Sequence, residues 1–161
     1  MKHIVKKKWI TGSGNQIDFY EILKIIKNHT ILGSKIFIGT DSFVSRKSVC
    51  FATAICLYGS ELGNRYFFFK ETKKEKPFAA LVSRITEETR RSIEIGCFLT
   101  QEYNFNPEDI ELHLDVSPFT AGTATSKFSD MLKGYVQGYG FDYRLKPDAW
   151  ASQSIADKHS K

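Results

Sequence analysis

A short apolar run ends in an acidic residue in the stretch Lys35-Ile36-Phe37-Ile38-Gly39-Thr40-Asp41-Ser42. The length and composition of this run predict a buried β-strand. Because an unpaired charge inside a protein is strongly unfavourable, core packing does not explain Asp41. The same pattern recurs at Asp115, in Leu112-His113-Leu114-Asp115-Val116-Ser117-Pro118, and at Asp148, in Lys146-Pro147-Asp148. Three acids at matching strand ends suggest a metal site.

The length and composition of the chain predict a globular protein. It has 161 residues, which is enough for one core and too few for two ordinary domains. Hydrophobic residues make up 42% and aromatic residues 14%, a composition that excludes a disordered chain. Residues 1–14 are rich in lysine and end in the flexible Gly12-Ser13-Gly14. We therefore expect a basic N-terminal arm over residues 1–14 and a single domain over residues 15–161.

The charge balance favours an anionic partner. The chain has 23 Lys and Arg against 18 Asp and Glu, a formal net charge of +5. A basic protein with acids at a few strand ends fits a polyanion-binding surface around a cation-binding centre, so nucleic acid is the expected partner. Ordinary solvated lysines explain the same net charge equally well. The cations expected to contact phosphates are Lys2, Lys6, Lys7 and Lys8 with the nearby Trp9, and Lys158, His159 and Lys161.

The cysteines and the absence of targeting patterns indicate a cytoplasmic protein. Cys50, Cys56 and Cys97 show no CxxC spacing and lie in apolar surroundings, which predicts buried reduced thiols and not zinc ligands. Residues 1–9 lack the apolar core of a signal peptide, and no apolar run is long enough to span a membrane. We therefore expect no membrane association.

The order of the predicted elements indicates an α/β fold. Strands over residues 35–42, 49–58 and 65–70 are separated by short polar breaks, which predicts an antiparallel meander. After a long helix over residues 78–100, the pattern alternates: a strand over 110–116, a helix over 126–139, a strand over 141–145 and a terminal helix over 149–161. This order predicts a five-stranded mixed sheet, three antiparallel strands and then two parallel ones, with flanking helices and an additional N-terminal helix.

The acids are expected to meet at one edge of this sheet. The strands that lead to Asp41, Asp115 and Asp148 would be parallel, and open α/β sheets bind ligands at the carboxyl ends of such strands. Crowded carboxylates repel one another unless a cation neutralises them, and hard oxygen ligands select Mg²⁺ or Mn²⁺. Two such ions about 3.5–4 Å apart support phosphoryl transfer, so we expect two ions.

The long helix offers a further acidic ligand. Glu88 falls three residues after Ile85 on the inward face of this helix, whereas Glu87 points more outward. Glu88 would act as a ligand, or would orient metal-bound water, if the first turns pack over the strand of Asp41. An ion pair with Arg84 or Arg91 on the face of the helix explains the presence of Glu88 at this position equally well.

Other candidate residues have competing interpretations. His113 lies two residues from Asp115 on the same face of the strand, where it is either a general acid, a donor to a carboxylate or, the more common case, a core histidine. The last acidic position is either Asp148 or Asp157. Ser154 lies three residues before Asp157, so Asp157 also fits a helix N-terminal capping box.

These motifs together resemble the ribonuclease H-like YkuK family. The resemblance covers about residues 16–161 and rests on Ile38-Gly39-Thr40-Asp41-Ser42, Thr86-Glu87-Glu88, His113-Leu114-Asp115-Val116, the run Lys146-Pro147-Asp148-Ala149-Trp150-Ala151-Ser152 and the run Ala156-Asp157-Lys158-His159-Ser160-Lys161. It implies a ribonuclease H-like fold with an acidic metal site. The positions that match the superfamily pattern are Asp41, Glu88, Asp115 and either Asp148 or Asp157.

Two functions are compatible with this sequence. The first hypothesis is a Mg²⁺- or Mn²⁺-dependent nuclease that hydrolyses RNA, DNA or hybrid phosphodiesters by a two-metal mechanism, with His113 or His159 assisting proton transfer. The alternative is a non-catalytic nucleic-acid or protein-binding module that retains the fold. A phosphatase acting on small phosphates is a less favoured third hypothesis.

Overall fold

A computed structural model describes residues 2–118, 122 and 125–161 of the chain. The strands are β1 (Trp9–Thr11), β2 (Gln16–Ile17), β3 (Lys35–Ser45), β4 (Ser48–Tyr58), β5 (Arg65–Lys74), β6 (Ile110–His113) and β7 (Asp142–Arg144). The α-helices are α1 (Phe19–Ile31), α2 (Leu81–Tyr103), α3 (Ser129–Gly138) and α4 (Asp157–Ser160). Short 3₁₀ segments are η1 (Lys2–Ile4), η2 (Lys76–Phe78), η3 (Pro107–Asp109) and η5 (Ser126–Phe128), and η6 (Ala151–Ala156) is a π-helix.

The strands form one mixed sheet in the order β2-β1-β5-β4-β3-β6-β7. The long strands β3, β4 and β5 are antiparallel neighbours, and β6 and β7 continue the sheet in parallel with β3. The predicted order of three antiparallel and two parallel strands is therefore confirmed for the five strands from β5 to β7 in this order. The fold is mixed α/β and is consistent with a ribonuclease H-like fold.

The predicted count of five strands is wrong, because the sheet has seven. The two additional strands form the hairpin β1–β2, and β1 pairs with the edge of β5 through Ile10 and Phe68. The sequence predicted a basic arm over residues 1–14, and in the structure the apolar side chains Ile4 and Trp9 of this segment are buried against the rest of the protein. Trp9 is fully buried, and its indole N–H donates to the carbonyl oxygen of Ile4 at 2.9 Å. The hairpin also covers backbone groups at the edge of β5 that would otherwise be unpaired.

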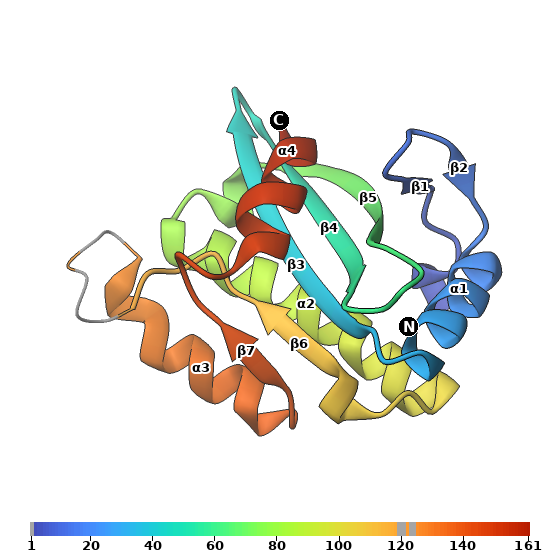
Figure 1. Cartoon of the computed structure of the whole chain (residues 1–161). Helices are drawn as coiled ribbons and strands as arrows, with labels where there is room; N and C mark the ends of the chain where they lie inside the picture. The colour runs from blue at the N-terminus through green and yellow to red at the C-terminus, as the bar shows by residue number, and fades with distance from the viewer. Residues whose placement is uncertain (1, 119–121, 123–124) are drawn as a thin grey trace.

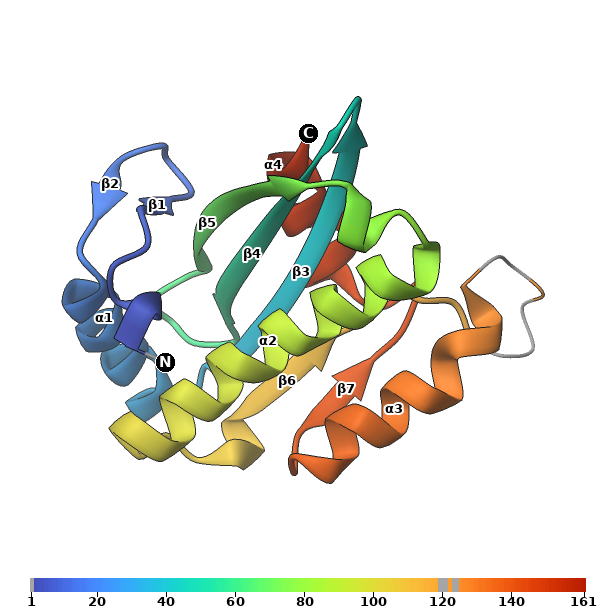
Figure 2. The same ribbon diagram turned by 180° about the vertical axis from the view of Figure 1, so that it is seen from behind.

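Helices cover both faces of the sheet (Figure 1). The view from behind shows α2 and α3 lying across one face, whereas η6 and α4 lie on the other (Figure 2). The main core lies on the α2 side and includes Ile36, Ile38 and Ile93. A smaller apolar cluster lies beneath η6 and includes Phe37, Ala54 and Ala151. In the described part of the chain, no helix is both long enough and apolar enough to span a membrane.

Gly39 allows the C-terminal segment to approach β3 closely. A Cβ atom built at Gly39 would lie 2.4 Å from the backbone nitrogen of Ser152 and 2.5 Å from the carbonyl carbon of Ala151. Both are backbone atoms, so neither can move aside by a side-chain rotation. Glycine is therefore required where η6 crosses β3, and this crossing sets the position of α4, which follows directly.

Replacing Gly39 with alanine should destabilise the protein. We expect Gly39→Ala to lower the free energy of unfolding by about 2–3 kcal/mol, because the methyl group forces η6 away from β3. Urea unfolding followed by circular dichroism measures this change. Gly134→Ala is the matched control, because a Cβ at Gly134 in α3 meets no atom within 4 Å and alanine favours a helix by about 1 kcal/mol over glycine. Equal stability of the two variants would contradict the packing role of Gly39.

Candidate metal centre

Three acidic side chains from separate elements meet at one end of the sheet. Asp41 lies on β3, Glu88 on α2 and Asp115 just after β6, and each offers a carboxylate oxygen within 4.8 Å of the other two. Asp41 and Glu88 are buried, with 6% and 7% of their surface exposed, and Asp115 is partly buried. The structure therefore brings together three of the acids named from the sequence.

The difference in length between β3 and β6 creates the space for this cluster. The parallel pairing of these strands ends where Gly39 lies beside His113, whereas β3 continues to Ser45. Asp41 thus lies two residues beyond the last β6 pair, and Asp115 follows β6 at the same level. Glu88 approaches from the α2 side of the sheet, where its Oε1 accepts a hydrogen bond of 2.5 Å from Ser42 Oγ.

The C-terminal helix brings a fourth carboxylate to the cluster. Asp157 in α4 is close enough to Asp41 to raise its pKa by hydrogen bonding and by charge repulsion. In the same helix, Ser160 Oγ donates to Asp41 Oδ2 at 3.2 Å. Ser160 is buried, and the sequence analysis did not assign it to the site. No short-range sequence signal identifies it, because its contact with Asp41 depends on the crossing of η6 over β3.

The crowding of the acids changes their protonation. Burial, together with the nearby carboxylates of Asp115 and Asp157, raises the pKa of Asp41 to about 8. Burial and the charge of Asp41 also raise the pKa of Glu88 well above its ordinary value. Near neutral pH Asp41 therefore retains a proton unless a cation replaces it. Several carboxylate oxygens within a few ångströms are the donor set that Mg²⁺ and Mn²⁺ prefer, so these residues fit a divalent ion.

Two lysines partly neutralise the cluster. Lys146 Nζ lies 3.0 Å from Asp115 Oδ1, and Lys161 Nζ lies 3.2 Å from Asp157 Oδ2. Lys146 was part of a recognised motif, but the sequence analysis assigned no role to it. Lys146 lies beside Asp115 because backbone hydrogen bonds join the segments that follow β6 and β7, which are far apart in the chain.

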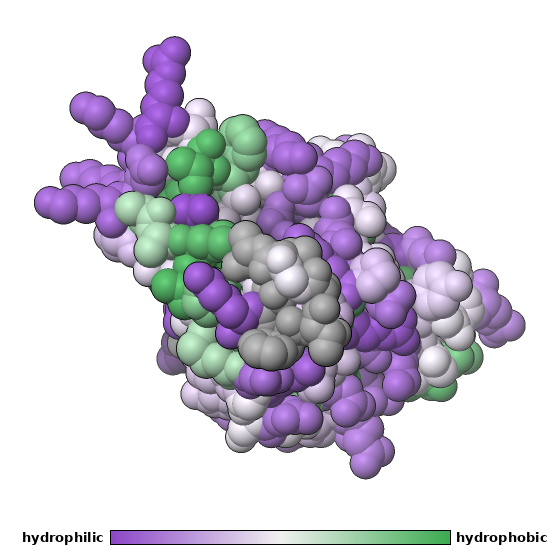
Figure 3. Space-filling view, turned by 90° about the vertical axis from the view of Figure 1, so that its left-hand side faces the viewer, coloured by the Kyte–Doolittle hydropathy of each residue, from purple (hydrophilic) through white to green (hydrophobic). Residues whose placement is uncertain are grey.

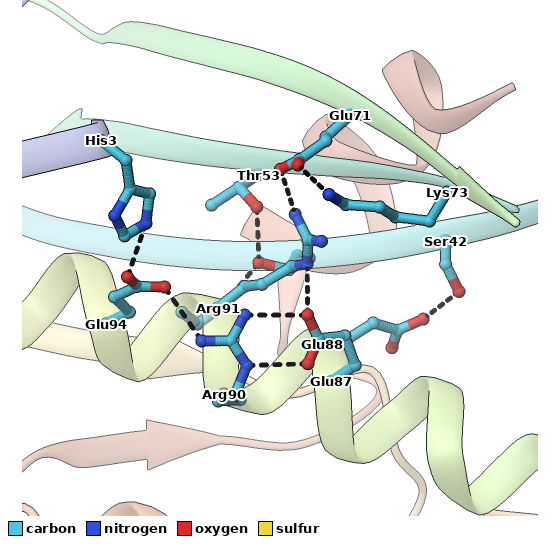
Figure 4. Close-up of polar contacts among 12 residues, drawn as sticks. His3, Ser42, Thr53, Glu71, Lys73, Glu87, Glu88, Arg90, Arg91 and Glu94 are labelled. Carbon is cyan, nitrogen blue, oxygen red and sulfur yellow. Dashed lines mark hydrogen bonds and ion pairs between the residues drawn. The ribbon is translucent and has the colours of Figure 1, made fainter. Parts of the chain in front are cut away.

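Glu87 lies outside the cluster and belongs to a separate ion-pair network. Its carboxylate accepts from Arg90 Nε at 2.7 Å and from Arg91 Nε at 2.9 Å, and Arg91 also donates to Glu71 at 3.0 Å. Figure 4 shows Glu87 directed toward these arginines and Glu88 directed toward Ser42. The two neighbouring glutamates therefore have different environments, as their positions on the helix predicted.

Asp148 and the two candidate histidines, His113 and His159, lie outside the three-carboxylate group. Asp148 is exposed in the turn after β7. His159 stacks on Phe68 with 3.6 Å between ring centroids, and its Nε2 lies 3.0 Å from the hydroxyl of Tyr66. His113 is buried beneath η6: its Nδ1 accepts from the Ala151 N–H at 2.9 Å. Both histidine side chains therefore make contacts within the fold.

The fold and the acidic cluster together are typical of one class of protein. An antiparallel β3–β4–β5 unit followed by parallel β6 and β7, with one acid on β3 and another just after the adjacent β6, is the arrangement expected of ribonuclease H-like proteins. A family model described as ribonuclease H-like matches residues 18–161, and the chain belongs to this family. The resemblance to the ribonuclease H-like YkuK family is thereby confirmed. No curated protein and no solved structure matches the chain.

His113 should remain neutral in mildly acidic solution. Because Nδ1 accepts from Ala151, the ring proton lies on Nε2, which is 3.1 Å from Glu111 Oε1. Burial and the charge of Arg144 lower the pKa of His113 to about 3, from 6.5. The unfolded chain therefore takes up this proton before the native state does, and stability falls as the pH falls from about 6.5 to about 3. Nitrogen NMR at about pH 5 should show a neutral Nε2–H ring at His113, and an imidazolium signal there would contradict this arrangement.

The metal-free protein should lose stability as the pH rises. With a native pKa of about 8 against an ordinary value of 3.8, Asp41 holds a proton that the unfolded state releases. The free energy of unfolding therefore falls from about pH 4 to about pH 8, by at most about 1.4 kcal/mol per pH unit for this group. Asp41→Asn should reduce this slope and stabilise the metal-free protein near pH 8.

Urea unfolding in the presence of a chelator measures this dependence. Asp130→Asn is the control, because Asp130 is exposed on α3 and its ion pair with Lys133 is long, at 3.7 Å. The same pH slope in Asp41→Asn and in the wild type would show that Asp41 does not titrate in this range.

Proposed function

We propose that the protein is a divalent-metal-dependent nuclease that hydrolyses phosphodiester bonds of a nucleic acid. The observation that carries this proposal is the convergence of Asp41, Glu88 and Asp115, with Asp157 beside them, in a chain that belongs to a ribonuclease H-like family. Family membership alone does not establish an activity. The burial and the raised pKa values of the cluster supply the physical argument, because they describe a site that gains stability when a cation enters.

Each acidic residue has a defined role in this proposal. Asp41, Glu88 and Asp115 would hold Mg²⁺ or Mn²⁺, and Asp157 would complete the oxygen set from α4. Asp157 is preferred to Asp148 because it acts on Asp41 directly, whereas Asp148 is exposed in the preceding turn. The sequence predicts two ions. When bound, a divalent ion lowers the pKa of a coordinated water and neutralises charge on the phosphate.

Two serines would hold these carboxylates in position. Ser42 Oγ donates to Glu88 and Ser160 Oγ donates to Asp41, so each orients an acidic side chain without contacting the substrate. In the net reaction a water oxygen bonds to phosphorus, the bond from phosphorus to the leaving oxygen breaks, and one water proton passes to the leaving oxygen. His113 has no part in this transfer, because both of its ring nitrogens have partners within the fold.

The surface around the centre suits a hydrated polyanion. Figure 3 looks onto the side toward which the arrowheads of β6 and β7 point in Figure 1, and hydrophilic residues cover most of it. Exposed cations lie at and near the end of the β3–β4 hairpin and of β5, namely Arg46, Lys47, Lys73, Lys74 and Lys76. Such side chains bind phosphate oxygens with strong salt dependence.

A non-catalytic nucleic-acid-binding module is the second candidate. The contacts of Lys146 with Asp115 and of Lys161 with Asp157 favour it, because they give the acidic cluster partial neutralisation without an ion. This module would bind nucleic acid through the exposed cations and would show no cleavage with any metal.

A cleavage assay separates the two candidates. End-labelled single-stranded RNA, single-stranded DNA and an RNA–DNA hybrid are incubated with Mg²⁺, with Mn²⁺ or with a chelator. We expect metal-dependent cleavage of at least one substrate, and a loss of at least roughly 100-fold in Asp41→Asn and Asp115→Asn, because each removes a ligand carboxylate. Binding with no cleavage under any of these conditions would support the non-catalytic module.

Matched variants test the choice of the fourth ligand. Asp157→Asn should lose most of the activity, Asp148→Asn should retain most of it, and the distant Asp130→Asn should resemble the wild type. The reverse order for Asp157 and Asp148 would assign the fourth ligand to Asp148. Full activity in both Asp41→Asn and Asp115→Asn would overturn the proposed centre.

A further inference from the structure

The sheet itself places Lys146 beside the acidic cluster. The Leu114 N–H donates to the Arg144 carbonyl, and the Lys146 N–H donates to the Val116 carbonyl, both at 2.9 Å. These two bonds lie just beyond the last pair of β6 and β7, in which His113 lies beside Arg144, and they join the segments that follow the two strands. The backbone therefore holds Lys146 near Asp115. The side chain completes the approach, with 3.0 Å between Lys146 Nζ and Asp115 Oδ1.

The charges around the centre leave room for one divalent ion. Fully ionised, Asp41, Glu88, Asp115 and Asp157 carry four negative charges. Among the residues that the structure describes, the cations in salt bridges with these acids are Lys146 and Lys161. The remaining charge of two negative units equals that of one divalent ion, whereas two divalent ions would leave an excess of positive charge.

Arg84 does not change this count. Its charge acts on Glu88, but its guanidinium donates to the carbonyl oxygens of Phe78 and Ala79, both at 3.0 Å. These two hydrogen bonds hold the guanidinium group of Arg84 at the start of α2. The cation in contact with the Asp115 carboxylate is thus Lys146.

We propose that the centre binds one divalent ion per chain and that the ammonium group of Lys146 takes the place of a second ion. This inference rests on the proposed function as a metal-dependent nuclease and revises the expectation of two ions. Lys146 occupies one oxygen of Asp115 at hydrogen-bond distance. A second ion about 4 Å from the first would need such an oxygen and would be repelled by the ammonium.

The chemical role of Lys146 follows from its position. A second ion in two-metal hydrolysis neutralises the charge that develops on the phosphate and on the leaving oxygen. An ammonium group supplies a positive charge and hydrogen-bond donors at the same place. The side chain of Lys146 is 35% exposed and is therefore accessible to a substrate at the end of the sheet.

Manganese stoichiometry tests the inference independently of activity. The full chain is titrated with Mn²⁺ by calorimetry, and the bound ions are examined by electron paramagnetic resonance. We expect one Mn²⁺ per wild-type chain with the spectrum of an isolated ion. Two ions about 4 Å apart would couple magnetically, and a coupled pair in the wild type would overturn the inference while supporting the metal centre.

Variants of Lys146 sharpen the test. In Lys146→Met, which keeps most of the side-chain length and removes the charge, we expect a second Mn²⁺ and spin coupling at high metal concentration. Cleavage at low metal concentration should fall roughly 100-fold and should recover in part as Mn²⁺ rises. Lys146→Arg keeps the positive charge and should still bind one ion. Lys133→Met, which removes a lysine from α3, should match the wild type.

The outcomes distinguish the inference from the proposed function. No Mn²⁺ binding by the wild type, together with no cleavage, would overturn both. One ion and undiminished cleavage in Lys146→Met would overturn the role of Lys146 and leave the nuclease proposal intact. Conversion from one ion to a coupled pair in Lys146→Met, but not in Lys133→Met, would support the inference.

Discussion

Repulsion among buried carboxylates is the constraint on which the acidic end of the sheet depends. Asp41 is buried among Asp115, Glu88 and Asp157, and the free energy of this arrangement is unfavourable unless protons, lysines or a cation neutralise it. A cluster of this kind lowers the stability of the metal-free fold. Binding sites often lower the stability of a protein in this way, because their side chains are arranged to contact a ligand and not to pack against one another.

The rest of the molecule holds this unfavourable cluster in place. The long antiparallel strands supply a rigid support for Asp41, and the close contact of η6 with Gly39 brings α4 over it. The position of the carboxylates therefore depends on packing that lies outside the cluster. Gly39, which has no functional group, therefore contributes to the site by allowing this close approach.

The two faces of the sheet contribute in different ways. On one face, α2 presents Glu88 to the centre and directs Glu87 into a network with Arg90 and Arg91. The other face carries the C-terminal segment, which adds Asp157 and buries His113. At the edge of the sheet, the hairpin β1–β2 covers β5, so that the functional end and the protected edge are separate.

Local sequence patterns determined the order of the strands and helices, the placement of Asp41 on a buried strand and of Asp115 near the end of another, and the inward face of α2 that carries Glu88. These features depend on periodicity and on neighbours within a few residues, so they are readable from the chain. Only the tertiary structure decided that Trp9 anchors two further strands, that Asp157 lies beside Asp41, and that Lys146 reaches Asp115. Each of these contacts joins residues far apart in the chain or depends on register between strands, and local propensity carries no information about such pairings.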